Sequence, residues 1–301
     1  MTNEVNSMSF GEVLTAMVTP FTVDGKVNYE KAQELALYLL SHGSDGIVVG
    51  GTTGENPSLS EEEAFILYRE VKDAVGNKGT VIGGAGNNCT EFVIKRIKQL
   101  NQLGLDGYLS VVPYYNKPTQ EGVYKHFEAI NHAAECPIIV YNIPGRTGIN
   151  LTPDTLVRMA DLINIKAIKE STGKVDQITE MKMRLPSDFA IYSGDDFMTF
   201  PIVAMGGTGV ISVASHLIGN EIKSMIQCLK HNDLAGARAL HLKYYPLFKG
   251  VFCTANPIPV KTALNLLGFE LGGFRLPICD PEPSDVKFLE NLLREYGLLK
   301  S

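Results

Sequence analysis

The chain has 301 residues, 45% hydrophobic and 20% charged, a balance typical of a globular protein with a sizeable core. A net charge of -6 without a basic run argues against a nucleic-acid partner. No apolar stretch is long enough to span a membrane, and the first residues lack the pattern of a signal peptide, so we expect no membrane partner. The scattered cysteines, five in all, form no metal-ligand spacing, so we expect reduced thiols, no metal and a cytoplasmic protein.

Strand-like apolar runs alternate with amphipathic, helix-like stretches along most of the chain. The predicted strands are Leu14–Val18, Gly46–Val49, Thr80–Gly83, Gly107–Val112, Pro137–Ile143, Ile165–Lys169, Phe189–Ser193 and Gly209–Val213. The predicted helices that follow them are Tyr29–Ser41, Glu61–Val75, Thr90–Leu103, Gln120–Ala134, Pro153–Leu162, Val175–Met183, Asp196–Met205 and Leu217–Lys230. Ser60 begins a capping box, and Thr152 is a helix cap followed by proline.

This alternation predicts an α/β fold, a (β/α)8 TIM barrel with a C-terminal helical region. An open doubly wound sheet is the alternative, but no Gly-x-Gly-x-x-Gly follows the first strand. We expect an N-terminal tail over residues 1–10, the barrel over 11–230 and a three-helix region over 231–301. The three C-terminal helices are predicted at Asn232–Phe248, Pro257–Leu267 and Ser284–Tyr296.

Lys169 ends the sixth predicted strand and is the main candidate nucleophile. At the period of a strand it shares a face with Ile163, Ile165 and Ala167, whereas Lys166 and Glu170 point the other way. Burial disfavours the charged ammonium, lowers its pKa and leaves an amine that can form a Schiff base with a carbonyl substrate. The alternative is a lysine whose stem lies along the strand while its ammonium reaches solvent.

Further polar and glycine-rich segments follow other predicted strands. In a barrel such segments meet at one mouth, the catalytic face. They are Gly50–Glu55, Pro113–Pro118, Tyr141–Gly148 and Tyr192–Asp196. Each alone has an ordinary explanation, as a tight turn, loop packing or a solvated charge. Together they place hydroxyl groups that can transfer protons and a guanidinium that can hold a carboxylate beside Lys169.

The motifs Gly51-Thr52-Thr53-Gly54-Glu55 and Tyr141-Asn142-Ile143-Pro144, with Lys169, resemble the N-acetylneuraminate lyase superfamily of pyruvate-dependent class I aldolases. Within it, Gly145-Arg146-Thr147-Gly148, Tyr114-Tyr115 and Ser193-Gly194-Asp195-Asp196 resemble the dihydrodipicolinate synthase family, and the similarity covers nearly the whole chain. The resemblance implies condensation of pyruvate with L-aspartate-4-semialdehyde to 4-hydroxy-tetrahydrodipicolinate, a step toward diaminopimelate and lysine, without metal or organic cofactor.

The resemblance also assigns catalytic roles. Lys169 would form the Schiff base with pyruvate, and Tyr141 would pass protons beside it. Thr52 would connect Tyr141 with Tyr115, which is expected from the neighbouring subunit of a tight dimer. Tyr114 would lie at the same interface, and the assembly implied is a homo-oligomer, expected to be a tetramer of two tight dimers.

The remaining site residues would bind substrate. Thr53 would hold the carboxylate of pyruvate, and Gly194 and Ile211 would line the pocket. Arg146 would bind the carboxylate of the aldehyde at the entrance. Arg146 is also the most discriminating residue, because aldolases of this superfamily that act on sugar acids generally lack it.

Family members that sense lysine bind it at the tight-dimer interface, near Tyr114 and Asn88. The positions that would hold it read Asn56, Glu61, Ala64 and Phe92 in this chain. Ala64 cannot form a polar contact with a ligand, and Phe92 replaces a carboxylate. We therefore expect weak or no inhibition by lysine, unless Glu91 takes the missing role.

Two other functions are compatible with parts of this pattern. A related pyruvate aldolase acting on a 2-oxo sugar acid, such as N-acetylneuraminate or 2-keto-3-deoxygluconate, would keep Lys169 and Tyr141 without needing Arg146. A non-catalytic barrel would be expected to lack the lysine or the hydroxyl groups, and none is missing here.

Overall fold

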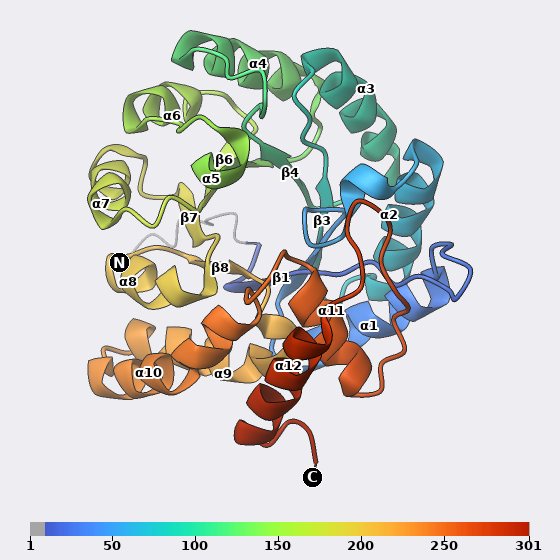
Figure 1. The fold of residues 1–301 in the computed structure, drawn as a ribbon. Coiled ribbons are helices and arrows are strands. Elements are labelled where there is room, and N and C mark those ends of the chain that lie inside the picture. The colour runs from blue at the N-terminus through green and yellow to red at the C-terminus, as the bar shows by residue number, and fades with distance from the viewer. Residues whose placement is uncertain (1–9, 301) are drawn as a thin grey trace.

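The computed structural model describes residues 10–300, and eight parallel strands form a closed barrel at its centre (Figure 1). The strands are β1 (Val13–Ala16), β2 (Gly46–Val49), β3 (Thr80–Gly84), β4 (Gly107–Val111), β5 (Ile138–Asn142), β6 (Ile165–Glu170), β7 (Ala190–Ser193) and β8 (Gly209–Ser212). They pair in sequence order, and β8 pairs with β1 to close the sheet. The predicted barrel is confirmed, and the open sheet is excluded.

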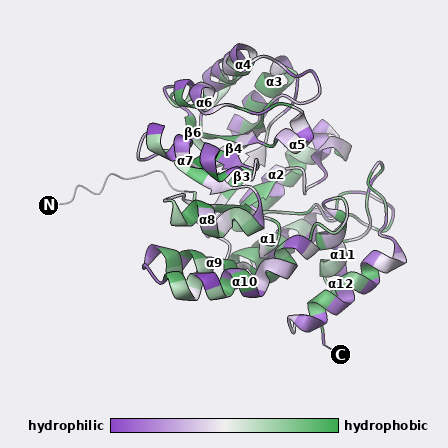
Figure 2. Cartoon of the chain, turned by 60° about the vertical axis from the view of Figure 1, so that its left-hand side comes forward, coloured by the Kyte–Doolittle hydropathy of each residue, from purple (hydrophilic) through white to green (hydrophobic). Residues whose placement is uncertain are grey.

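Helices cover the outside of the barrel. They are α1 (Tyr29–Ser41), α2 (Glu61–Val75), α3 (Thr90–Leu100), α4 (Gln120–Ala133), α6 (Pro153–Met159), α7 (Val175–Arg184), α8 (Thr199–Ala204) and α9 (Ser215–Lys230). The short helix α5 (Pro144–Thr147) follows β5 at the mouth of the barrel. The capping box of Ser60 and the cap of Thr152 form as predicted. Figure 2 shows hydrophobic and hydrophilic stretches alternating along these helices, as expected when one side packs on strands and the other meets water.

Three more helices, α10 (Leu234–Gly250), α11 (Ile258–Leu266) and α12 (Pro283–Glu295), follow the barrel. They lie along the side formed by α9 and α1 (Figure 1). The segment between α11 and α12 returns to the loop after β2, which brings the C-terminal region to the mouth of the barrel. No helix within residues 10–300 is both long and apolar enough to cross a membrane.

Side chains from alternate strand positions fill the barrel interior. This layer consists of Phe10, Leu14, Ala16, Val48, Ile82, Leu109, Ile139, Tyr141, Ala167, Ala190, Tyr192 and Ile211. Phe10 ends the segment expected as a tail, yet it is buried in this layer; residues 1–9 of that segment lie outside the described residues. A Cβ on Gly84 would lie 2.0 Å from the carbonyl oxygen of Gly50, so only glycine allows β3 and the loop after β2 to approach this closely.

The pairing of β5 with β6 changes the predicted facing of residues before Lys169. Ile138 pairs with Ile165 but Ile139 pairs with Ala167, so one residue of β6 is skipped. Ala167 therefore faces the interior, whereas Ile165 packs between the sheet and the helices. The prediction that Ile163 and Ile165 share the face of Lys169 is wrong, and Ile163 is exposed.

Candidate active site

The carboxyl ends of the strands surround a cavity of about 170 Å3. Its lining brings together six site residues predicted from the sequence, which are Thr52, Thr53, Tyr141, Arg146, Lys169 and Gly194. Asp195, Val213, Phe252 and Asn256 also line it. The segments after β2, β5, β6 and β7 thus meet at one place, as their positions after strands predicted.

Lys169 lies inside this cavity, and its side chain is buried. Its neighbour in the barrel pairing is Tyr141 of β5, and the Lys169 Nζ lies 4.3 Å from the centre of the Tyr141 ring. Burial lowers the pKa of Lys169 to about 8, against the opposing charges of Asp195 and Asp196. The lowered pKa gives Lys169 a larger share of the neutral, nucleophilic amine near neutral pH than an ordinary lysine has.

Tyr141 is the nearest candidate for proton transfer. It is almost completely buried, and burial raises the pKa of its hydroxyl, as does the charge of Asp195. The hydroxyl therefore stays protonated and can act as a proton donor beside the amine. The following residue, Asn142, donates a hydrogen bond of 3.0 Å to Glu170, which is buried on the outer side of the barrel.

Gly194 leaves the space that the lysine side chain needs. A Cβ at this position would lie 3.1 Å from Lys169 Cε and 1.9 Å from Ser171 Oγ. Any larger residue would displace one of these two groups. Ile211 belongs to the interior layer of the barrel, and Val213, two residues further along, lines the cavity.

The loop after β2 is held in place from both sides. Asn256 donates a hydrogen bond of 2.9 Å from Nδ2 to Thr53 Oγ1, and the Thr19 hydroxyl donates one of 2.6 Å to the carbonyl of Gly54. Because Thr53 Oγ1 accepts from Asn256, its own proton is free for a ligand. Asn256 was not predicted from the sequence, since it lies 203 residues from Thr53 along the chain.

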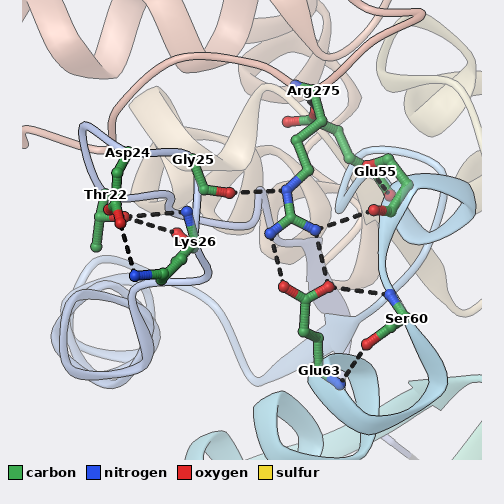
Figure 3. A network of polar contacts seen from close by, with 9 residues as sticks. Thr22, Asp24, Gly25, Lys26, Glu55, Ser60, Glu63 and Arg275 are labelled. Atoms are coloured by element: carbon green, nitrogen blue, oxygen red, sulfur yellow. Dashed lines mark hydrogen bonds and ion pairs between the residues drawn. The ribbon is translucent and has the colours of Figure 1, made fainter.

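The C-terminal region also contacts this loop from outside the cavity (Figure 3). The guanidinium of Arg275 lies between Glu63 of α2, at 2.6 and 2.8 Å, and the carbonyl oxygens of Gly25 and Ser58. The backbone amide of Arg275 donates to the carboxylate of Glu55, the last residue of the predicted motif. The motif is therefore fixed by residues that follow it by about two hundred positions.

Arg146 lies on α5, a short helix that is not among the helices predicted from the sequence. It lines the cavity and also a larger hollow of about 500 Å3 beside it, which Thr52, Tyr114 and Tyr141 line as well. Its side chain is exposed, and its charge lowers the pKa of Lys169. This position at the outer edge suits a group that binds a substrate before reaction.

Tyr115 is the one predicted catalytic residue that the chain does not bring to Lys169. Its side chain is 86% exposed, and its backbone has a φ of +73°, an uncommon value for a residue other than glycine. It lines neither hollow. A role for Tyr115 therefore requires a second copy of the chain.

Residues 9–295 match the model of the dihydrodipicolinate synthetase family. A 4-hydroxy-tetrahydrodipicolinate synthase of Microcystis aeruginosa is 53% identical over 96% of this chain and 98% of its own. The corresponding enzyme of Synechocystis is 52% identical over 99% of this chain and 100% of its own. The crystal structure of a dihydrodipicolinate synthase from Cyanidioschyzon merolae, determined with lysine bound, superposes with a TM-score of 0.95. The two chains are 47% identical, and the match covers 96% of this chain and 99% of that one.

Proposed function

The chain belongs to the dihydrodipicolinate synthetase family, and we propose that it condenses pyruvate with L-aspartate-4-semialdehyde to give 4-hydroxy-tetrahydrodipicolinate. The family expectation drawn from the sequence is thereby confirmed. The observation that carries the reaction is the buried amine of Lys169 beside Tyr141 at the carboxyl end of the barrel.

In the first half of the reaction, Lys169 attacks the ketone carbon of pyruvate and forms an imine with loss of water. The Tyr141 hydroxyl donates a proton to the departing oxygen. The Thr53 hydroxyl donates a hydrogen bond to the pyruvate carboxylate, because its oxygen already accepts a hydrogen bond from Asn256. The Tyr141 oxygen, which has given up its proton, then takes one from the methyl group. The C–H electrons form the enamine double bond and neutralise the protonated imine, so that no metal or organic cofactor is needed.

In the second half, the enamine carbon attacks the aldehyde carbon of the second substrate, and the Tyr141 hydroxyl donates a proton to the aldehyde oxygen, which becomes the hydroxyl group of the product. Arg146 holds the carboxylate of that substrate at the outer edge of the cavity with a charge-assisted pair. Ring closure joins the amino nitrogen of the substrate to the imine carbon and releases Lys169. The product leaves with the enzyme unchanged.

Protons reach Tyr141 through Thr52 and through Tyr115 of a second subunit in this proposal. Thr52 and Tyr114 line the larger hollow, and Tyr115 extends from the same loop into solvent in the isolated chain. The unit expected to be active is therefore a tight dimer, and we propose a tetramer of two such dimers. We place the enzyme in the cytoplasm, in keeping with its five free cysteines.

A coupled assay tests the reaction against its alternative. Purified protein receives pyruvate with L-aspartate-4-semialdehyde, with N-acetylmannosamine or with glyceraldehyde, and pyruvate consumption is followed. We expect turnover with the first aldehyde only. Faster turnover with either of the other two would assign the chain to the sugar-acid aldolases instead.

A further inference from the structure

Asp195 is an acidic residue of the cavity to which the proposed reaction gives no role. Among residues 10–300, no other aspartate or glutamate lines this cavity. It follows Gly194 at the end of β7, so it lies one strand beyond Lys169 of β6, while Arg146 follows β5 on the other side. The cavity therefore has a cationic and an anionic side chain on opposite sides of the nucleophile.

The next residue, Asp196, differs from Asp195 in that hydrogen bonds from the protein satisfy its carboxylate. It is buried, and it accepts hydrogen bonds from the Ser212 hydroxyl and from the backbone amides of Val213 and Ala214. Within the described part of the chain, the carboxylate of Asp195 accepts no hydrogen bond and forms no ion pair. Asp195 is thus half-buried and unpaired, although leaving a carboxylate poorly solvated is costly.

The charged groups around Asp195 do not supply the partner that its carboxylate lacks. Burial raises its pKa, and Asp196 acts in the same direction, while Lys169, Lys249 and Arg146 lower it. Lys249 is exposed, and its Nζ lies 4.7 Å from the centre of the Phe197 ring. No cation of the described chain is close enough to pair with Asp195, so a cationic ligand would gain most from this position.

We propose that Asp195 binds the α-ammonium of the aldehyde substrate, and so makes the cavity selective for an aldehyde that is also an α-amino acid. The inference rests on the proposed function and deepens it. L-Aspartate-4-semialdehyde carries an ammonium and a carboxylate on one carbon atom. Arg146 takes the carboxylate and Asp195 the ammonium, which fixes both ends of the zwitterion and directs its aldehyde toward the enamine on Lys169.

The test compares two aldehydes on the Asp195→Asn variant. Succinate semialdehyde has the carboxylate and aldehyde of the natural substrate but hydrogen in place of the ammonium. We expect D195N to lower kcat/KM for L-aspartate-4-semialdehyde by about tenfold to a hundredfold, the loss typical of one charge-assisted contact. The inhibition constant of succinate semialdehyde against the pyruvate-loaded enzyme should change by less than about twofold.

Asp188→Asn is the matched control, because it removes the same charge from an exposed position near the start of β7. It should change neither constant. Asp195→Ser serves as a second variant if D195N is not recovered folded. Thermal unfolding measurements verify that each variant is folded.

Equal losses with both aldehydes would overturn the inference, because Asp195 would then act on Lys169 and not on the ammonium. Unchanged kcat/KM for L-aspartate-4-semialdehyde would overturn it too. Failure of the proposed function looks different: the unmodified enzyme would trap pyruvate but form no product from L-aspartate-4-semialdehyde.

Discussion

Lys261 of α11 and Glu55 of the loop after β2 form an ion pair that is shielded from solvent, with 3.1 Å between Nζ and Oε1. Lys261 also lies over the rings of Phe21 and Phe274, at 4.1 and 5.1 Å. Burial lowers the pKa of Lys261 to about 8 despite the charge of Glu55. The pair joins the C-terminal region to the motif that carries Thr53.

Removing one partner of this pair should destabilise the fold strongly. Lys261→Met leaves the Glu55 carboxylate buried without its cation, which typically costs about 3–5 kcal/mol. The double variant Glu55→Gln with Lys261→Met should lose much less, because neither charge then remains. Denaturant unfolding of the single and double variants measures this coupling, and additive losses would contradict it.

Lys169 should carry the covalent adduct with pyruvate. Borohydride reduction in the presence of pyruvate should add the pyruvyl mass to Lys169, located by peptide mass spectrometry. Modification of Lys166 or Lys174 instead would contradict the assignment. Lys169→Ala provides the control and should show no adduct.

The rate of imine formation should depend on pH in a way that reports the buried amine. At a pH below its pKa of about 8, Lys169 is mostly protonated, and the protonated form cannot attack. The rate should therefore rise with pH through about 8 and then level off. An unperturbed lysine would give a rate still rising toward pH 10. Stopped-flow measurements on the first turnover with pyruvate distinguish the two profiles.

Arg146→Ala should affect the second substrate and spare the first. Loss of the charge-assisted pair with the aldehyde carboxylate costs roughly 1.5–3 kcal/mol, about tenfold to a hundredfold in kcat/KM. The apparent KM for L-aspartate-4-semialdehyde should rise while borohydride still traps pyruvate. Arg69→Ala, which removes an exposed arginine of α2, is the control. If a folded Arg146→Ala protein no longer traps pyruvate, the role is wrong.

Tyr115 should complete the site of a second subunit. Tyr115→Phe and Lys169→Ala should each be nearly inactive alone, and hybrid dimers formed by mixing them should regain activity, because one of the two sites then has both residues. Subunit exchange is verified with differently tagged proteins. Proven exchange without rescue would count against a shared site.

The barrel was predictable because its strands are continuous apolar runs and its helices have clear caps, as at Ser60 and Thr152. The buried position of Lys169 in the cavity was predictable because the irregularity of β6 lies before Ala167 and leaves the alternation from Ala167 to Lys169 unchanged. That irregularity itself left no signal in the sequence, so Ile165 was assigned to the wrong face. Glu170 was expected only to point away from Lys169, yet it is buried, because the helices cover that side as well.

The supporting residues of the site were beyond the reach of local patterns. Asn256, Lys261 and Arg275 act on the loop of Thr53 through contacts that span more than two hundred residues. Nothing in their own segments indicates a functional partner. Such contacts depend on how the C-terminal helices pack against the barrel, which periodicity and capping do not specify.

Inhibition by lysine should be weak or absent, although a similar enzyme from Cyanidioschyzon merolae was crystallised with lysine bound. The positions that the family resemblance connects with lysine sensing do not favour a cation here. Ala64 is buried and Phe92 is 57% exposed. Glu61 is paired with Lys95 at 3.1 Å. Glu91 is exposed and does not line the larger hollow.

The larger hollow near these positions contains Arg96 and Arg146 but, among the described residues, no carboxylate. A lysine ligand needs a partner for its side-chain ammonium, and each missing charge-assisted contact costs roughly 1.5–3 kcal/mol. Titration of activity with L-lysine at saturating substrates should therefore show no submillimolar inhibition. Phe92→Glu should increase sensitivity, with Phe92→Gln as the uncharged control. Strong submillimolar inhibition of the unmodified enzyme would mean that Glu91 or a residue of a second subunit supplies the carboxylate.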